Sequence, residues 1–192
     1  MEYTFKRMSP DLWDDLVALF GPDGASDGCW CMSWRSKEHV EGEAAKVQLK
    51  ELVAANRVRG VLAYIGDTPV GWCSYGPRCD FPQAEAHLGE GSSSHPAWSV
   101  PCFFVHADHR GCGIGSLLLE QAIQAIQEST GRLAEGFPMD PNVPDKEAHA
   151  DWSFTGTFGM FHKAGFADSG QRMNVYGGSS ECQLLCMNCN LS

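Results

Sequence analysis

A glycine-rich segment between a buried strand and a buried helix constrains the fold of this chain more than any other feature. Residues 98–105 (WSVPCFFV) are almost wholly apolar, and residues 115–128 carry apolar side chains at the spacing of a helix buried along one side. The connecting residues 110–115 read RGCGIG. Glycine allows a tight turn and a close approach of a ligand to backbone amides, and the helix that follows presents unpaired N–H groups and a positive dipole end. This arrangement predicts a cradle for a phosphate group.

Two other phosphate-binding motifs fit this loop poorly. The nucleoside triphosphatase loop needs G-x-x-x-x-G-K, and no Lys follows Gly115. The dinucleotide fingerprint G-x-G-x-x-G fails when it starts at Gly111, because Ser116 then holds its last position. Glu135 does lie about 20 residues further on, where a dinucleotide-binding fold has its ribose-binding acid. A nucleotide-binding protein therefore stays open as an alternative.

Two motifs at the expected separation resemble those of one enzyme superfamily. The loop fits V-x-x-x-x-R-G-x-G-[IL]-[GA] from Val105 to Gly115, and residues 160–166 (MFHKAGF) are similar to a helix ending L-Y-E-K-x-G-F. Both patterns are typical of the GNAT N-acetyltransferases, which the chain resembles over about residues 3–172. The pair of motifs is more specific than either one alone. A glycine turn that only shapes the fold is the alternative.

The resemblance implies an α/β (α+β) fold. In this fold a mixed, mostly antiparallel central sheet with one splayed strand pair is flanked by helices. The order of the expected elements agrees, because a strand and two helices precede a hairpin over residues 60–75, and strand, helix, strand, helix and strand follow. One domain is expected over residues 1–176, and residues 177–192 would be a tail or the final strand of the same domain.

The resemblance also implies acetyl-coenzyme A as the co-substrate. Its pyrophosphate would lie on the loop amides, and its pantetheine would pair with the strand before the loop. A backbone N–H near Phe104 or Val105 would polarise the thioester carbonyl. The amine acceptor would then attack directly, without a covalent enzyme intermediate. The expected cofactor-binding residues are Phe103, Phe104, Val105, Arg110, Gly111, Cys112, Gly113, Ile114, Gly115 and Ser116.

The sequence gives a candidate for the general base but none for the general acid. Glu135, on the strand after the glycine loop, is the candidate general base, acting through water. A structural ion pair or a plain exposed acid is the alternative for Glu135. The family's usual general acid is a Tyr at a position that here holds Phe161, which cannot donate a proton. The sequence therefore assigns no general acid.

Candidate acceptor-binding residues lie in two segments. Trp30 and Trp34 would either contact a charged amine through cation–π interactions or fill the core between the first two helices. His149 and Asp151, in the loop before the fourth helix, would bind substrate or act as bases, or else be solvated loop residues. The expected acceptor is a small primary amine, such as an amino sugar antibiotic or a polyamine. A protein or peptide acetyltransferase and a non-catalytic acyl-coenzyme A sensor are the alternatives.

Composition limits the classes of binding partner and the cellular compartment that fit this chain. A formal charge of −10 argues against nucleic acid, and no run approaches the roughly 18 apolar residues of a membrane span. Nine cysteines without a secretory signal indicate reduced thiols in a cytoplasmic protein. The pairs Cys29-x-Cys31 and Cys186-x-x-Cys189 raise the alternative of a zinc site, but the first spacing is tight, so no metal is expected. A homodimer is compatible with this interpretation.

Overall fold

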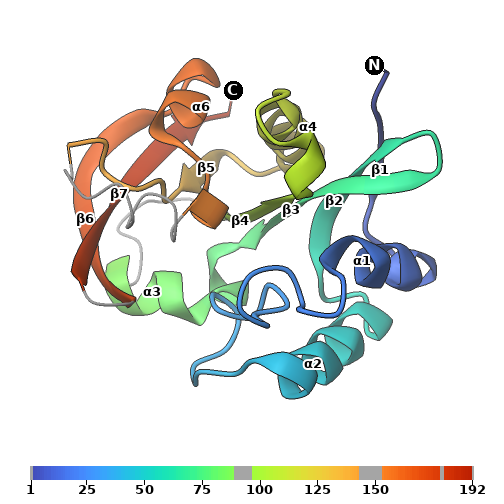
Figure 1. Cartoon of the computed structure of the whole chain (residues 1–192). Coiled ribbons are helices and arrows are strands. Elements are labelled where there is room, and N and C mark those ends of the chain that lie inside the picture. The colour runs from blue at the N-terminus through green and yellow to red at the C-terminus, as the bar shows by residue number, and fades with distance from the viewer. Residues whose placement is uncertain (1, 89–96, 143–152, 178–179, 192) are drawn as a thin grey trace.

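The computed structural model describes residues 2–88, 97–142, 153–177 and 180–191 as a seven-stranded sheet with helices on both faces (Figure 1). The strand order is β1-β2-β3-β4-β5-β7-β6, and only β4 and β5 pair in parallel. The predicted mixed, mostly antiparallel α/β architecture is therefore confirmed. The strands are β1 (Thr4–Arg7), β2 (Arg59–Ile65), β3 (Thr68–Pro77), β4 (Ala97–Val105), β5 (Leu133–Gly136), β6 (Ala167–Gly177) and β7 (Ser180–Asn190).

The sheet separates the core into two clusters, and helices cover each face (Figure 1). Buried side chains of α1, α2 and α3 pack on one face, and those of α4 and α6 pack on the other. The helices are α1 (Trp13–Phe20), α2 (Gly42–Ala54), α3 (Pro82–Leu88), α4 (Ile114–Glu128) and α6 (Phe158–Lys163), with short 3-10 turns η1 (Pro10–Leu12), η2 (Arg78–Asp80), η3 (Ala107–His109) and η4 (Ser153–Thr155).

One helix boundary and one further helix differ from what the sequence predicts. The apolar spacing of residues 37–56 predicts a helix from about residue 37, but α2 begins at Gly42, whose φ is +59° and whose N–H bonds to the carbonyl of Gly28. The chain before Gly42 therefore belongs to the loop. The polar, Gly/Ser-rich composition of residues 77–96 predicts a loop, yet the described part of this segment contains η2 and α3. The seven residues of α3 are too few to show a helical period.

The strand pair β4 and β5 is splayed, as expected. Residues 97–100 of β4 pair with β5, whereas its residues 102–105 pair only with β3 among the residues described. At the same point Ser74 faces Cys102 but Gly76 faces Ser99, so β4 carries one extra residue. This bulge includes Pro101, which has no N–H to donate. The second half of β4 is left with one unpaired edge.

The C-terminal strand β7 (Ser180–Asn190) lies between β5 and β6 and pairs with both. Leu184, Leu185 and Met187 of this strand are buried. The C-terminal strand is therefore part of the central sheet.

Candidate functional site

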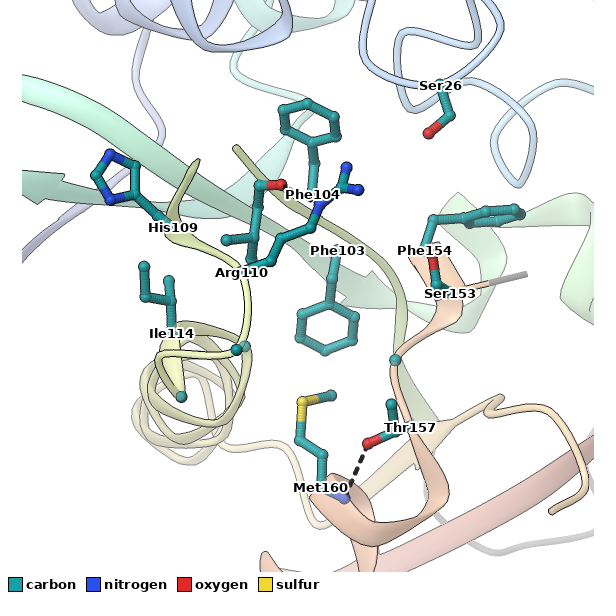
Figure 2. A pocket seen from close by; sticks show the side chains of 15 residues that line it. Ser26, Phe103, Phe104, His109, Arg110, Ile114, Ser153, Phe154, Thr157 and Met160 are labelled. Carbon is teal, nitrogen blue, oxygen red and sulfur yellow. Dashed lines mark hydrogen bonds between the residues drawn. The ribbon is translucent and has the colours of Figure 1, made fainter. Parts of the chain in front are cut away.

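A pocket of about 200 Å³ lies where β4, the start of α4 and the start of α6 meet (Figure 2). All the predicted cofactor-binding residues line it except Cys112 and Ser116. Residues from the α1–α2 loop and from around η4 complete the wall. The lining residues are Ser26, Phe103, Phe104, Val105, His109, Arg110, Gly111, Gly113, Ile114, Gly115, Ser153, Phe154, Gly156, Thr157 and Met160.

The glycine loop leaves the N-terminus of α4 uncovered at the pocket. Gly111 (φ +75°) and Gly113 (φ +81°) adopt left-handed conformations, and a Cβ built on either would meet nothing within 4 Å. Gly113 is the N-cap of α4 and supplies no side-chain hydrogen bond, and the first turn contains no acid. The positive end of the helix therefore faces open space that an anion can fill.

Close packing against β3 fixes the start of α4. A Cβ added to Gly71 would lie 2.9 Å from Cγ2 of Ile114 and 3.1 Å from Cδ1 of Leu118. The absence of a side chain at Gly71 thus lets the first turn of α4 approach the sheet. This contact places the glycine loop beside the end of β4.

The free edge of β4 presents backbone donors to the pocket. The N–H of His106 donates to the carbonyl of Val70 at 3.0 Å. Because backbone groups alternate along an antiparallel strand, Phe104 also faces β3, and the N–H groups of Phe103 and Val105 face the free edge. Arg110 reaches across from the loop, and its Nε donates to the carbonyl of Val105 at 3.0 Å (Figure 2). Of the two expected carbonyl donors, the alternation favours Val105 over Phe104.

At the start of α6, the pocket wall has the hydroxyl of Thr157 and no tyrosine phenol. Phe161 is fully buried between Phe103 and Phe166, with ring centroids 6.0 and 5.1 Å away, and it does not line the pocket. Thr157 does line the pocket. Its Oγ1 accepts the N–H of Met160 at 3.3 Å and so caps α6 (Figure 2).

Glu135 lies on β5 outside the pocket lining, and its side chain is 1% exposed. Its carboxylate accepts two hydrogen bonds from Arg78, one of them from Nε to Oε2 at 2.9 Å. The hydroxyl of Ser99, its neighbour on β4, lies 3.5 Å from Oε2. The structure therefore shows an ion pair, and a role as general base stays a prediction. The sequence did not indicate Arg78, because its partner is 57 residues away.

The two tryptophans predicted as acceptor-binding or core residues lie in the core. Trp30 is 3% exposed and packs against Trp13 and Phe20, with ring centroids 6.2 and 5.7 Å away. Trp34 is 5% exposed and stacks on Phe137 at 5.2 Å. Neither lines the pocket. The other acceptor candidates, His149 and Asp151, lie outside the described residues.

The cysteine pairs that raised a zinc alternative lie on different elements. Cys31 belongs to the α1–α2 loop and Cys186 to β7. Within residues 2–88, 97–142, 153–177 and 180–191, no group of three or more His, Cys, Asp or Glu could hold a metal ion. None of the described helices has the length and apolar character needed to cross a membrane.

Comparison with known proteins gives a consistent result. The model of the acetyltransferase (GNAT) family matches residues 26–145, more than half of the 192 residues. No curated protein matches the sequence. Among solved structures, an N-acetyltransferase from Staphylococcus aureus Mu50 is similar with a TM-score of 0.65 and 14% identity over 100% of both chains.

Two further solved structures are similar across the whole fold. A putative acetyltransferase from Salmonella typhimurium, solved with its cofactor acetyl-CoA, has a TM-score of 0.59 and 13% identity over 99% of this chain and 94% of its own. A putative phosphinothricin N-acetyltransferase has a TM-score of 0.62 and 17% identity, over 100% of this chain and 99% of its own. At these identities the likeness shows the fold.

Proposed function

Because the chain belongs to the acetyltransferase (GNAT) family, whose acyl donor is acetyl-coenzyme A, we propose that it acetylates the primary amine of a small molecule. The observation that carries the proposal is the pocket that combines the bare N-terminus of α4 with the free edge of β4. The first feature suits a pyrophosphate and the second suits an extended amide chain. The similar putative phosphinothricin N-acetyltransferase supports a small acceptor.

The residues present fit acetyl-coenzyme A. The open space at Gly111 and Gly113 lets a phosphate approach the loop amides, and no carboxylate of the first turn opposes it. The N–H groups of Phe103 and Val105 are free to pair with the pantetheine amides and to donate to the thioester carbonyl. Bound acetyl-coenzyme A supplies the activated acetyl group. The chain itself orients that group and stabilises negative charge on the carbonyl oxygen.

Proton transfer accompanies the attack of the amine. An alkylammonium has a pKa of about 10, so it must lose a proton before it can attack. We assign this proton to Glu135 through a water molecule, with Arg78 and Ser99 holding the carboxylate in place. The hydroxyl of Thr157 lies in the pocket wall and is available to donate to the leaving sulfur. No covalent intermediate on the enzyme is needed.

A thiol-release assay tests the proposed function. The protein is given acetyl-coenzyme A and a panel of amino sugars, polyamines, amino acids and short peptides, and free coenzyme A thiol is measured. Turnover on a small amine is the expected result. Turnover on peptides alone would assign a peptide acetyltransferase, and calorimetric binding of acetyl-coenzyme A without any turnover would assign a sensor. Either result would overturn the proposal of a small-molecule acceptor.

A further inference from the structure

The sulfur of Cys31 lies in a buried polar group that the proposed reaction does not use. Cys31, in the α1–α2 loop, is 3% exposed, and Cys102 of β4 is 6% exposed. The indole Nε1 of Trp72 donates to Sγ of Cys31 at 3.4 Å. Cys102 belongs to the same buried cluster as Cys31 and Trp72, and it faces Ser74 across β3 and β4. A buried sulfur that accepts the indole N–H is placed to be a thiolate.

A guanidinium supplies the matching positive charge. Arg35 donates from Nη2 to Oγ of Ser74 at 2.9 Å and stacks over the ring of Phe81 at 4.5 Å. Its Nε is buried without a hydrogen-bond partner, and Arg35 makes no salt bridge to another residue that the structure describes. Asp80, the acid whose charge acts on Arg35, is bonded to Arg59 at 3.2 Å. A buried cation is costly without a counter-charge, and a Cys31 thiolate provides one.

The same contacts separate the pKa values of the two thiols. The hydrogen bond from Cys102 and then the charge of Arg35 lower the pKa of Cys31 to about 6, with further help from Trp72 and Ser74. The hydrogen bond to Cys31 and burial raise the pKa of Cys102 well above its ordinary value. Burial also raises the pKa of Cys73 on β3. The two thiols therefore share one proton as a pair, and the hydrogen bond from Trp72 favours the negative charge on Cys31.

The backbone at Cys31 is strained. Trp30 (φ +44°) and Cys31 (φ +58°) are consecutive non-glycine residues in the left-handed region. The buried ring of Trp30 and the hydrogen bond from its N–H to the carbonyl of Gly24, 3.1 Å long, keep the turn in place. Such strain persists where the surrounding structure over-determines it, which is common at reactive sites.

We propose that Cys31 and Cys102 form a peroxide-oxidised thiol pair that closes to a disulfide. The Cys31 thiolate attacks one oxygen of hydrogen peroxide, the O–O bond breaks, and hydroxide leaves, so that Cys31 becomes a sulfenic acid. The sulfur of Cys102 then attacks the sulfur of Cys31 and displaces hydroxide, which takes up the Cys102 proton and leaves as water. In total, two thiols and one hydrogen peroxide give one disulfide and two water molecules.

The burial of the pair favours a small, uncharged oxidant such as hydrogen peroxide over a bulky disulfide. The product would tie the α1–α2 loop to β4 at the residue before Phe103, whose N–H faces the free edge. Thiolate character and a nearby resolving thiol are two of the features that direct oxidation to one cysteine among many. Cys79 and Cys112 are exposed free thiols.

Peptide mapping by mass spectrometry tests the proposal on the reduced wild-type protein treated with a small excess of hydrogen peroxide. The expected product is a cross-linked pair of peptides that contain Cys31 and Cys102, which dithiothreitol separates again. In Cys102→Ser, dimedone should label a sulfenic acid at Cys31. The control variant Cys79→Ser should form the same cross-link as the wild type.

Two results would overturn the proposal, and both come from the wild-type protein, so they do not depend on whether a variant folds. One is oxidation of exposed Cys79 or Cys112 while Cys31 keeps a free thiol. The other is oxidation of Cys31 to sulfinic acid while Cys102 stays reduced. Neither result bears on acetyl transfer, which is measured separately.

Discussion

Arg78 of η2 holds the carboxylate of Glu135 on β5 through two hydrogen bonds, and the two side chains are only 12% and 1% exposed. Ser99 of β4 completes the contact. Three of the buried polar residues, Ser74, Ser99 and Glu135, thus lie on the neighbouring strands β3, β4 and β5. These three residues bring polar groups into a core whose other buried residues are mostly apolar.

Breaking this ion pair should destabilise the fold strongly. Glu135→Gln removes the carboxylate that accepts two hydrogen bonds from the buried Arg78 guanidinium, and we expect it to lower the free energy of unfolding by about 3 kcal/mol. Arg78→Gln should lower the free energy of unfolding by a similar amount. The double variant should lose less of this free energy than the two single variants lose together. Urea unfolding of the three variants measures this coupling. Additive losses would mean that the two side chains do not depend on each other.

The pH dependence of the rate tests the catalytic role of Glu135 separately from its structural role. If the carboxylate takes the proton of the amine, Glu135→Gln should flatten the rise of kcat/KM with pH. Arg78→Gln is the matched control, because it breaks the same ion pair but keeps the carboxylate. A profile of unchanged shape in Glu135→Gln would remove Glu135 as the base.

An alanine at position 113 should impair cofactor binding without breaking the fold. Gly113→Ala puts a Cβ into the open space at the N-terminus of α4 and strains a residue at φ +81°, so stability should fall by about 1 kcal/mol. Affinity for acetyl-coenzyme A should fall about tenfold, which corresponds to about 1.4 kcal/mol. Gly66→Ala is the control, since Gly66 (φ +58°) is equally open but lies in the β2–β3 turn. Equal affinity in both variants would contradict the assignment of the loop.

The stability of the reduced protein should depend on pH through Cys31. The folded-state pKa of Cys31 is lowered to about 6 from an ordinary value near 9. The contribution of the Cys31 thiolate to the free energy of unfolding is therefore fully present above the pKa of the unfolded state. It is lost as the pH falls toward the pKa of the folded state. Between about pH 6 and pH 8, the wild type should gain about 1 kcal/mol per pH unit relative to Cys31→Ser. Urea unfolding in the presence of a reductant measures this difference, and parallel curves would contradict the thiolate.

The features that the sequence predicted well are those whose cause is local. The strand before residue 106, the loop of residues 110–115 and helix α4 follow from consecutive apolar residues, from glycines and from a helical period. The resemblance of this segment to the acetyltransferases then led to the cofactor pocket. The same residues that make the turn also leave the helix end open.

The features that the sequence missed depend on contacts between distant segments. Arg78 lies in a region without a clear pattern, and only the fold brings it to Glu135. Trp30 fits a binding site or a core equally well until its stacking on Trp13 decides between them. The environment of Cys31 is assembled from a loop and two strands, so a cysteine count could not distinguish it from its neighbours.

The position of Phe161 leads to a final prediction, because the acetyltransferases that the sequence resembles have a Tyr there. The ring of Phe161 is fully buried, and a Cβ on Gly136 or on Gly156 would lie 2.1 or 3.0 Å from it. A hydroxyl added by Phe161→Tyr would enter this apolar packing, so the free energy of unfolding should fall by about 1–3 kcal/mol.

The rate of acetyl transfer by Phe161→Tyr should not rise, because Phe161 is fully buried and does not line the pocket. Phe166→Tyr is the matched control: it adds a hydroxyl to the neighbouring buried ring, whose centroid lies 5.1 Å away. Urea unfolding and the thiol-release assay measure both effects. A Phe161→Tyr protein that is as stable as the wild type and faster would show that position 161 can reach the leaving sulfur. Thr157 would then lose its place as the proposed donor.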